Sequence, residues 1–142
     1  MRVRYFALIF GIVYGLVGLA GFIPGLMSHG DMPEMAVDTL YGRLLGLFPV
    51  NLLHTLVHLA VGLWGILVWK SFSASRTYAQ SIAVIFAVLT VLGLIPMTNT
   101  LFGLVPLFGH DIWLHAATAL IAGYFGFSTE RGAVGTSSAV PR

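Results

Sequence analysis

Four apolar runs divide the sequence, and their lengths constrain the fold more than any other feature. A bilayer core of about 30 Å is crossed by roughly 20 apolar residues, because a helix rises about 1.5 Å per residue. The runs that approach this length are residues 5–27, 50–69, 78–97 and 112–127, of which the last is the shortest. The sequence therefore predicts one membrane domain, residues 1–127, with four spanning helices.

The composition favours the same environment. Hydrophobic residues make up 58% of the 142 residues and charged residues only 8%, whereas soluble domains contain about 25% charged residues. The formal net charge of +2 is too small to argue for a nucleic-acid partner, and none is expected. The chain has no cysteine, which excludes disulfides, thiolate metal sites and thiol catalysis.

The basic residues orient the predicted spans, since Lys and Arg are retained in loops on the cytoplasmic side of a membrane. Only Arg43 falls in a loop on the opposite side. The other six share one side of the predicted topology: Arg2, Arg4, Lys70, Arg76, Arg131 and Arg142. The predicted fold is therefore an all-α, integral membrane four-helix bundle with both termini in the cytoplasm, in a bacterial inner membrane.

The segments outside the spans differ in character. The first outer loop is acidic and is expected to contain a short amphipathic helix over about residues 33–47. The second, TNTLFGLVPLFGHD, is almost uncharged and is expected to lie at the outer membrane surface or in the mouth of the bundle. The tail, residues 128–142, is small and polar and is expected to be a disordered cytoplasmic segment without an assigned role.

Histidines interrupt the second and fourth runs. His54 and His58 are four positions apart and share one helical face with Asn51, and Asp111 and His115 have the same spacing in the fourth run. Both runs cross in the same direction, so these residues, near the start of each run, are expected at similar depth. The sequence predicts an outward-facing polar cluster of all five between the second and fourth spans.

Three interpretations of this cluster stay open. In the first, the side chains form a structural network that pins the helices or binds a partner subunit, as in an accessory protein. In the second, His54, His58 and His115 bind a transition metal with Asp111 as an orienting group or fourth ligand. Alternatively, His58 and His115 bind haem beside the small residues Gly62 and Ala119. In the third, the cluster relays protons or ions. The spacing does not separate these metals, so the cofactor is unknown.

An enzyme is not the leading interpretation. The motif H-x-x-x-H lacks the Glu of the metalloprotease motif, and no side chain is placed for nucleophilic or acid–base hydrolysis, so no catalytic residue is assigned. His29 and His110 are expected in loops or at the interface.

Glycines at positions 11, 15, 18 and 25 mark one face of the first run. Small residues at such spacing let two helices approach closely. This face is expected to pack against another helix, with self-association or room for a cofactor as alternatives. The expected partners are accordingly the lipid bilayer and either other membrane subunits or a second copy of the chain.

Two stretches resemble a known family. GRLLGLFPVNLLHTLVHLAVGLWGIL, with its F-P-V-N-x-x-H-x-x-x-H core, and GHDIWLHAATALIAGYFGF, with D-x-x-L-H, are similar to the bacterial four-span membrane proteins of the domain-of-unknown-function 4383 (DUF4383) family. The resemblance runs from the first span to the fourth and implies a four-helix membrane protein, but no activity. The matching positions are Phe48, Pro49, Asn51, His54, His58, Asp111 and His115. Thr55 departs from the Asn more usual in the family, which would weaken a site that used that amide.

Overall fold

The fold is mainly helical. A computed structural model describes residues 2–128 of the chain. Its four α-helices are α1 (Arg2–Ala20), α2 (Leu52–Val68), α3 (Phe72–Leu94) and α4 (His110–Phe127). Between α1 and α2 lie a 3-10 turn (Pro24–Leu26) and three short strands, β1 (Met27–Ser28), β2 (Gly42–Leu44) and β3 (Phe48–Val50). The prediction of a helical fold with four helices is confirmed, and the predicted tail lies outside the described residues except for Ser128.

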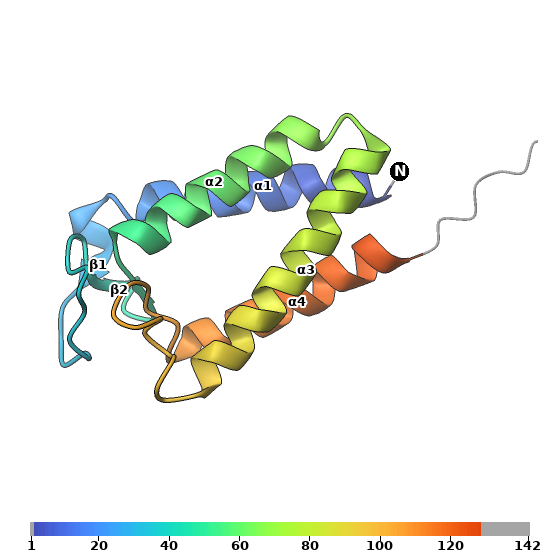
Figure 1. The fold of residues 1–142 in the computed structure, drawn as a ribbon. Helices are drawn as coiled ribbons and strands as arrows, with labels where there is room; N and C mark the ends of the chain where they lie inside the picture. The colour runs from blue at the N-terminus through green and yellow to red at the C-terminus, as the bar shows by residue number, and fades with distance from the viewer. Residues whose placement is uncertain (1, 129–142) are drawn as a thin grey trace, which may run out of the picture.

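The helices are arranged as two hairpins, with α1 packed along α2 and α3 along α4 (Figure 1). The hairpins lie close together near the N-terminus and the α2–α3 turn, and they diverge toward the end that carries the strands and the α3–α4 loop. The apolar core lies where they meet and consists of Val3, Phe6, Ala7, Tyr14, Tyr78, Ala79, Ile82, Ala83, Phe86 and Ala122.

Glycines bring α1 and α2 into backbone contact. A Cβ atom added to Gly11 would lie 2.7 Å from the amide nitrogen of Ile66 and 2.8 Å from the carbonyl oxygen of Gly62. A Cβ atom on Gly62 would in turn lie 2.7 Å from the Cα of Gly15. The expected close packing is therefore confirmed within the chain at Gly11 and Gly18, whereas a Cβ atom on Gly15 or Gly25 would meet nothing within 4 Å.

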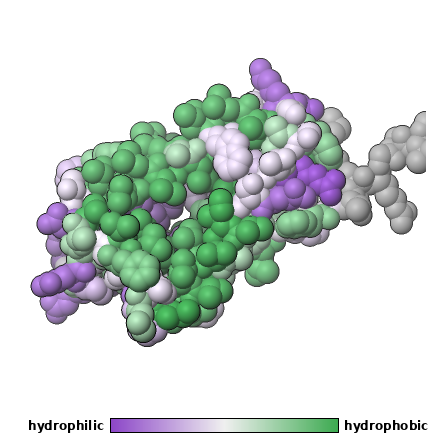
Figure 2. Space-filling view, in the orientation of Figure 1, coloured by the Kyte–Doolittle hydropathy of each residue, from purple (hydrophilic) through white to green (hydrophobic). Residues whose placement is uncertain are grey.

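Two helices, α1 and α3, are long and apolar enough to cross a membrane, with 19 and 23 residues. Such helices also occur in soluble cores, where they are mostly buried, but only 33% of the apolar window of each is buried here. α2 is apolar and has 17 residues, and α4 has 18 residues but does not meet the same criterion. Figure 2 shows hydrophobic residues over most of one face of the hairpins and hydrophilic residues gathered toward its two ends.

The helix ends differ from the predicted span ends because hydropathy does not report capping. α1 stops at Ala20 rather than near residue 27, since Gly21 and Pro24 follow. α3 begins at Phe72 rather than residue 78 because the hydroxyl of Ser71 accepts a hydrogen bond from the Ala74 N–H at 3.3 Å.

The prediction of an amphipathic helix over residues 33–47 is wrong. The segment instead contributes β2 to an antiparallel sheet of order β1-β2-β3, in which Arg43 lies opposite Pro49. Leu40 and Leu45 have φ values of 54°, which interrupt a right-handed helix. Pro49 lies in β3, an edge strand, where a missing N–H is tolerated.

Asn51 joins three parts of the chain. Its side-chain oxygen caps α2 by accepting a hydrogen bond from the His54 N–H at 3.0 Å. Its amide donates to the carbonyl oxygens of Val37, at 2.9 Å, and Leu104, at 2.7 Å. The side chain is completely buried. One residue therefore fixes the start of α2 against both long loops, and the α3–α4 loop lies over the diverging end of the hairpins.

We expect Gly62→Ala to destabilise the fold, because the added methyl group would meet backbone atoms of Gly11 and Gly15 that move only if α1 and α2 separate. Overpacking of this kind costs about 1–3 kcal/mol. Thermal unfolding in detergent measures the effect. Gly123→Ala is the matched control, since its Cβ would meet only Ala83, at 3.8 Å. Equal melting temperatures for the two variants would contradict the backbone contact.

Asn51→Asp should be as destabilising as Asn51→Ala, although Asp is a good helix cap. Asp keeps the oxygen that accepts from His54, but it turns a second oxygen toward the carbonyl groups of Val37 and Leu104. Each unsatisfied buried group costs about 1–3 kcal/mol. The melting temperature is compared with that of Ser71→Asp, an exposed helix cap where little change is expected. If the Asn51→Asp protein is as stable as the wild type, Asn51 stabilises the fold only as a helix cap, and its amide contacts with Val37 and Leu104 contribute little.

Candidate functional site

Buried polar side chains gather where the two hairpins diverge. They come from α2, with the residue that precedes it, and from α4, and none exposes more than 4% of its surface. The group consists of Asn51, His54, Thr55, His58, Asp111, His115 and Thr118. It contains all five residues of the polar cluster that the sequence predicts.

The helical period places these side chains inside the fold. On α2 the histidines lie in line with the buried Gly62 and Gly65, and on α4 Asp111 and His115 lie in line with Thr118, Ala122 and Gly126. The opposite faces are apolar and exposed, as at Leu63 and Leu120. Each helix thus presents a polar and small face to the interior and an apolar face to its surroundings.

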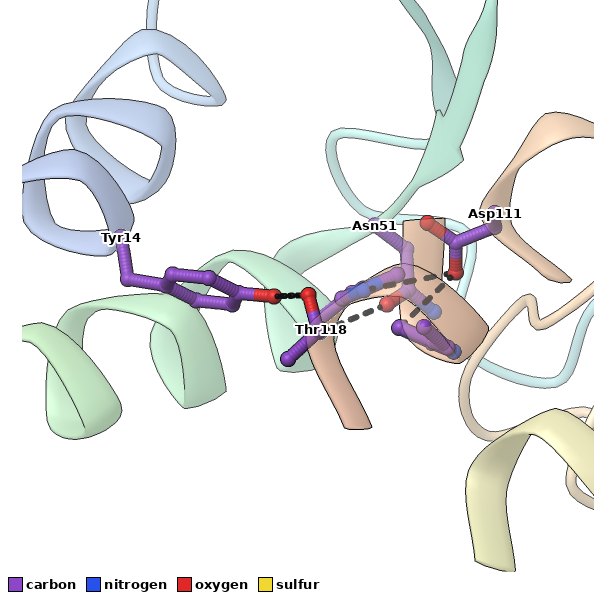
Figure 3. Close-up of polar contacts among 6 residues, drawn as sticks. Tyr14, Asn51, Asp111 and Thr118 are labelled. Atoms are coloured by element: carbon purple, nitrogen blue, oxygen red, sulfur yellow. Dashed lines mark hydrogen bonds and ion pairs between the residues drawn. The ribbon is translucent and has the colours of Figure 1, made fainter. Parts of the chain in front are cut away.

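Asp111 lies at the centre of the cluster. Its Oδ2 is 3.4 Å from Nε2 of His115 on the same helix and 3.7 Å from Nε2 of His54 on the other hairpin (Figure 3). Both separations exceed the roughly 2.7–3.2 Å of an N–H···O hydrogen bond. Within residues 2–128, neither oxygen of Asp111 has a hydrogen-bond partner, and Nδ1 of His115 has none either. The His54 ring lies near the backbone carbonyl groups of Pro49 and Pro106.

These three residues form a group with metal-ligand geometry. One ligand atom from each of His54, Asp111 and His115 lies within 4.8 Å of the other two, and all three residues are buried. The group differs from the predicted metal set, because Asp111 takes the place of His58.

His58 has ring contacts instead. Its ring lies 4.5 Å from that of His54 and meets the ring of Tyr14 edge-on at 5.2 Å, measured between centroids. The Tyr14 hydroxyl is hydrogen-bonded to Thr118 Oγ1 at 2.8 Å, as Figure 3 shows. Phe86 packs edge-on against His115 at 5.1 Å. Tyr14 and Phe86 therefore bound the cluster on the side of the apolar core.

The haem interpretation does not fit these residues. It needs space beside His58 at Gly62, but the backbone of α1 fills that space at Gly11 and Gly15. The ring of Tyr14 also lies against His58. The small residues of α2 serve helix packing rather than a macrocycle.

Two histidines lie outside the cluster, and two aromatic residues that the sequence did not predict lie against it. His29 and His110 are exposed, in agreement with their expected place in loops or at a helix end. Tyr14 and Phe86 were not predicted to contact the histidines. For Tyr14 a signal existed, namely a hydroxyl within an apolar run on the same face as the glycines, whereas nothing in the sequence distinguishes Phe86.

The comparison with known proteins identifies a family without an activity. No curated protein and no solved structure matches this chain. A family model described as a domain of unknown function matches residues 4–128, a range that includes every residue of the cluster. The chain therefore belongs to the DUF4383 family.

Proposed function

We propose that this protein is a four-span integral membrane protein of the bacterial inner membrane, with α1 to α4 as its spans. The exposed apolar faces of all four helices support this, as at Leu16, Leu63, Val88 and Leu120. The shorter helices, α2 and α4, extend about 26 Å, slightly less than the roughly 30 Å of a bilayer core. The strands and the α3–α4 loop would complete the outer boundary.

The distribution of charge supports an orientation with both termini in the cytoplasm. At the end where the hairpins converge, the described charged residues are Arg2, Arg4, Lys70 and Arg76, all basic. The acidic residues 31, 34 and 38 belong to the segment at the opposite end. This asymmetry follows the positive-inside rule.

Within this bundle we propose a site for one divalent transition-metal ion, held by His54, Asp111 and His115. The observation that carries the proposal is the set of three buried donors whose spacing suits a metal better than hydrogen bonding. Ligands about 2.0–2.2 Å from a tetrahedral ion lie about 3.4 Å from one another. The separations of 3.4 and 3.7 Å at Asp111 are close to that value.

The charge of the site supports a cation. A buried carboxylate needs a compensating charge or a proton, because burial of an unpaired charge is costly. The ion pairs of Asp111 among the described residues are with the two histidines, which are charged only when protonated. A divalent ion would supply the charge and leave both imidazoles neutral, as ligation requires.

The donor atoms restrict the choice of metal. Two imidazole nitrogens with one carboxylate oxygen suit Zn²⁺ or Fe²⁺ better than Mg²⁺ or Ca²⁺, which prefer oxygen ligands. Three protein ligands leave coordination positions for water or a small ligand. We assign a metal-binding role to this membrane protein and no catalytic reaction.

The structural-network interpretation has its own support, but at other residues. The side-chain oxygen and the amide nitrogen of Asn51 both form hydrogen bonds, which hold α2 and the two loops together. The Tyr14 hydroxyl is hydrogen-bonded to Thr118. These contacts join helices and loops directly. The His54, Asp111 and His115 group forms no such hydrogen bonds among its members. A proton or ion relay, and a role as an accessory subunit, stay predictions.

The metal site predicts a specific pattern of variants. Protein purified without a His tag, and incubated with Zn²⁺ or Fe²⁺ before desalting, should retain about one ion per chain by elemental mass spectrometry. Asp111→Asn and His115→Ala should abolish retention because each removes one of only three protein ligands. His58→Ala should retain the ion because His58 is outside the ligand group.

The exposed histidines provide the controls for this experiment. His29→Ala and His110→Ala should bind as the wild type does, and size-exclusion chromatography should show all variants folded. Wild-type protein that retains neither ion, or equal losses in His110→Ala and His115→Ala, would overturn the metal site. A lower melting temperature of Asp111→Asn without any bound metal would favour the structural network.

The absence of native cysteine allows a clean test of topology. Single cysteines replace Asp38, in the segment before β2, and Ser73, in the first turn of α3; both positions are exposed. In intact spheroplasts a membrane-impermeant maleimide should label Asp38→Cys and should label Ser73→Cys only after permeabilisation. The reverse pattern would invert the orientation, and labelling of both in intact cells would contradict the four-span arrangement.

A further inference from the structure

An apolar groove lies outside the polar cluster, between the first half of α1 and the second half of α4. Its volume is about 490 Å³, within the roughly 300–1,000 Å³ of ligand pockets. One basic residue, Arg2, lies at its edge. The other lining residues are Tyr5, Phe6, Ile9, Phe10, Ile121 and Phe125. The groove is a surface feature that the proposed metal site does not use.

Stacked aromatic rings form the floor of the groove. Phe6 stacks on Phe10 with centroids 4.8 Å apart and on Phe125 with centroids 5.0 Å apart. Phe6 belongs to the buried core, whereas Tyr5, Ile9 and Ile121 are exposed along the rim. The groove therefore has a floor fixed by core packing and opens sideways, toward the lipid of the proposed bilayer.

The position and charge of the groove indicate its occupant. From Arg2 to Phe10 the groove follows α1 for about 12 Å, which is close to the roughly 15 Å of hydrocarbon in one leaflet. A partner helix would instead need a face that crosses both leaflets. Arg2 is exposed at the end of the bundle where every described charged residue is basic. Such an end attracts anionic lipid headgroups.

We propose that this groove binds one anionic phospholipid of the cytoplasmic leaflet. One acyl chain lies on the floor formed by Phe6, Phe10 and Phe125, and the phosphate is paired with Arg2. The inference rests on the proposed membrane insertion and orientation, but it is independent of the metal site.

Native mass spectrometry of the delipidated full-length protein in detergent tests the proposal. Phosphatidylglycerol and phosphatidylcholine with identical acyl chains are the probes. We expect one phosphatidylglycerol per chain, bound about fivefold more tightly than phosphatidylcholine, since a basic residue near anionic lipid contributes about 1 kcal/mol. Arg2→Gln should remove this preference. Ile121→Trp, which fills the groove from its rim, should weaken binding of both lipids.

Lys70→Gln is the matched control, because it removes one positive charge from the same end of the bundle but does not line the groove. Its preference for phosphatidylglycerol should stay within a factor of about two of the wild type. Inorganic phosphate should not compete, since the acyl chain contributes to binding. Equal losses in Lys70→Gln and Arg2→Gln, or full binding to Ile121→Trp, would overturn the groove assignment.

Two further readouts separate the possible failures. A dimer mass in the wild type that Ile121→Trp converts to a monomer would assign the groove to a second copy of the chain and overturn the lipid proposal. Cysteine labelling of the same preparations reports membrane insertion independently. Insertion with both termini inside, together with no phosphatidylglycerol binding, would overturn the lipid site alone.

Discussion

Polar contacts between buried side chains are the constraint on which the arrangement of the two hairpins depends at their diverging end. Within each hairpin the helices are held by close packing, through glycines between α1 and α2. Between the hairpins, apolar packing occurs where they converge, around Phe6, Tyr78 and Ile82. At the diverging end, a hydrogen bond of 2.8 Å joins Tyr14 on α1 to Thr118 on α4, and Oδ2 of Asp111 on α4 lies 3.7 Å from Nε2 of His54 on α2. Lipid offers little hydrophobic drive for helix association, so in a bilayer close packing and such polar contacts would together hold the hairpins.

This arrangement couples the proposed metal site to the geometry of the bundle. His115 and Asp111 belong to one hairpin and His54 to the other, so an ion bound by all three bridges the hairpins. A ligand stabilises the conformation that it binds best, by an amount that its differential affinity sets. Metal binding would therefore hold the diverging end closed, beneath the strands and the α3–α4 loop. Asn51, whose amide bonds those loops to the start of α2, also helps to hold this end closed, and it does so without a metal.

Much of the fold and most of the site could be predicted from the sequence, for identifiable reasons. Hydropathy found the four helices, and the i, i+4 spacing with the shared direction of two runs placed His54 and His115 at similar depth, with Asn51 and Asp111 one turn above them. Hydropathy could not find the first turns of α3, because residues 72–77 are helical but largely polar. Nor could it find the sheet, which depends on left-handed backbone at Leu40 and Leu45. The proposal of Asp111 rather than His58 as a metal donor rests on the positions of the side-chain atoms, which the sequence spacing does not contain.

The stretch from Phe48 to His58 combines two kinds of structure in one short motif. The strand residues before Asn51 fix its position, Asn51 fixes the start of α2, and the start of the helix fixes the rotation that turns His54 toward Asp111. Thr55 follows His54 directly and is buried on the side facing the end of α1, where a Cβ atom on Gly21 would meet its hydroxyl. The side chain at this position therefore faces the end of α1 rather than Asp111, and it is not one of the three proposed metal donors.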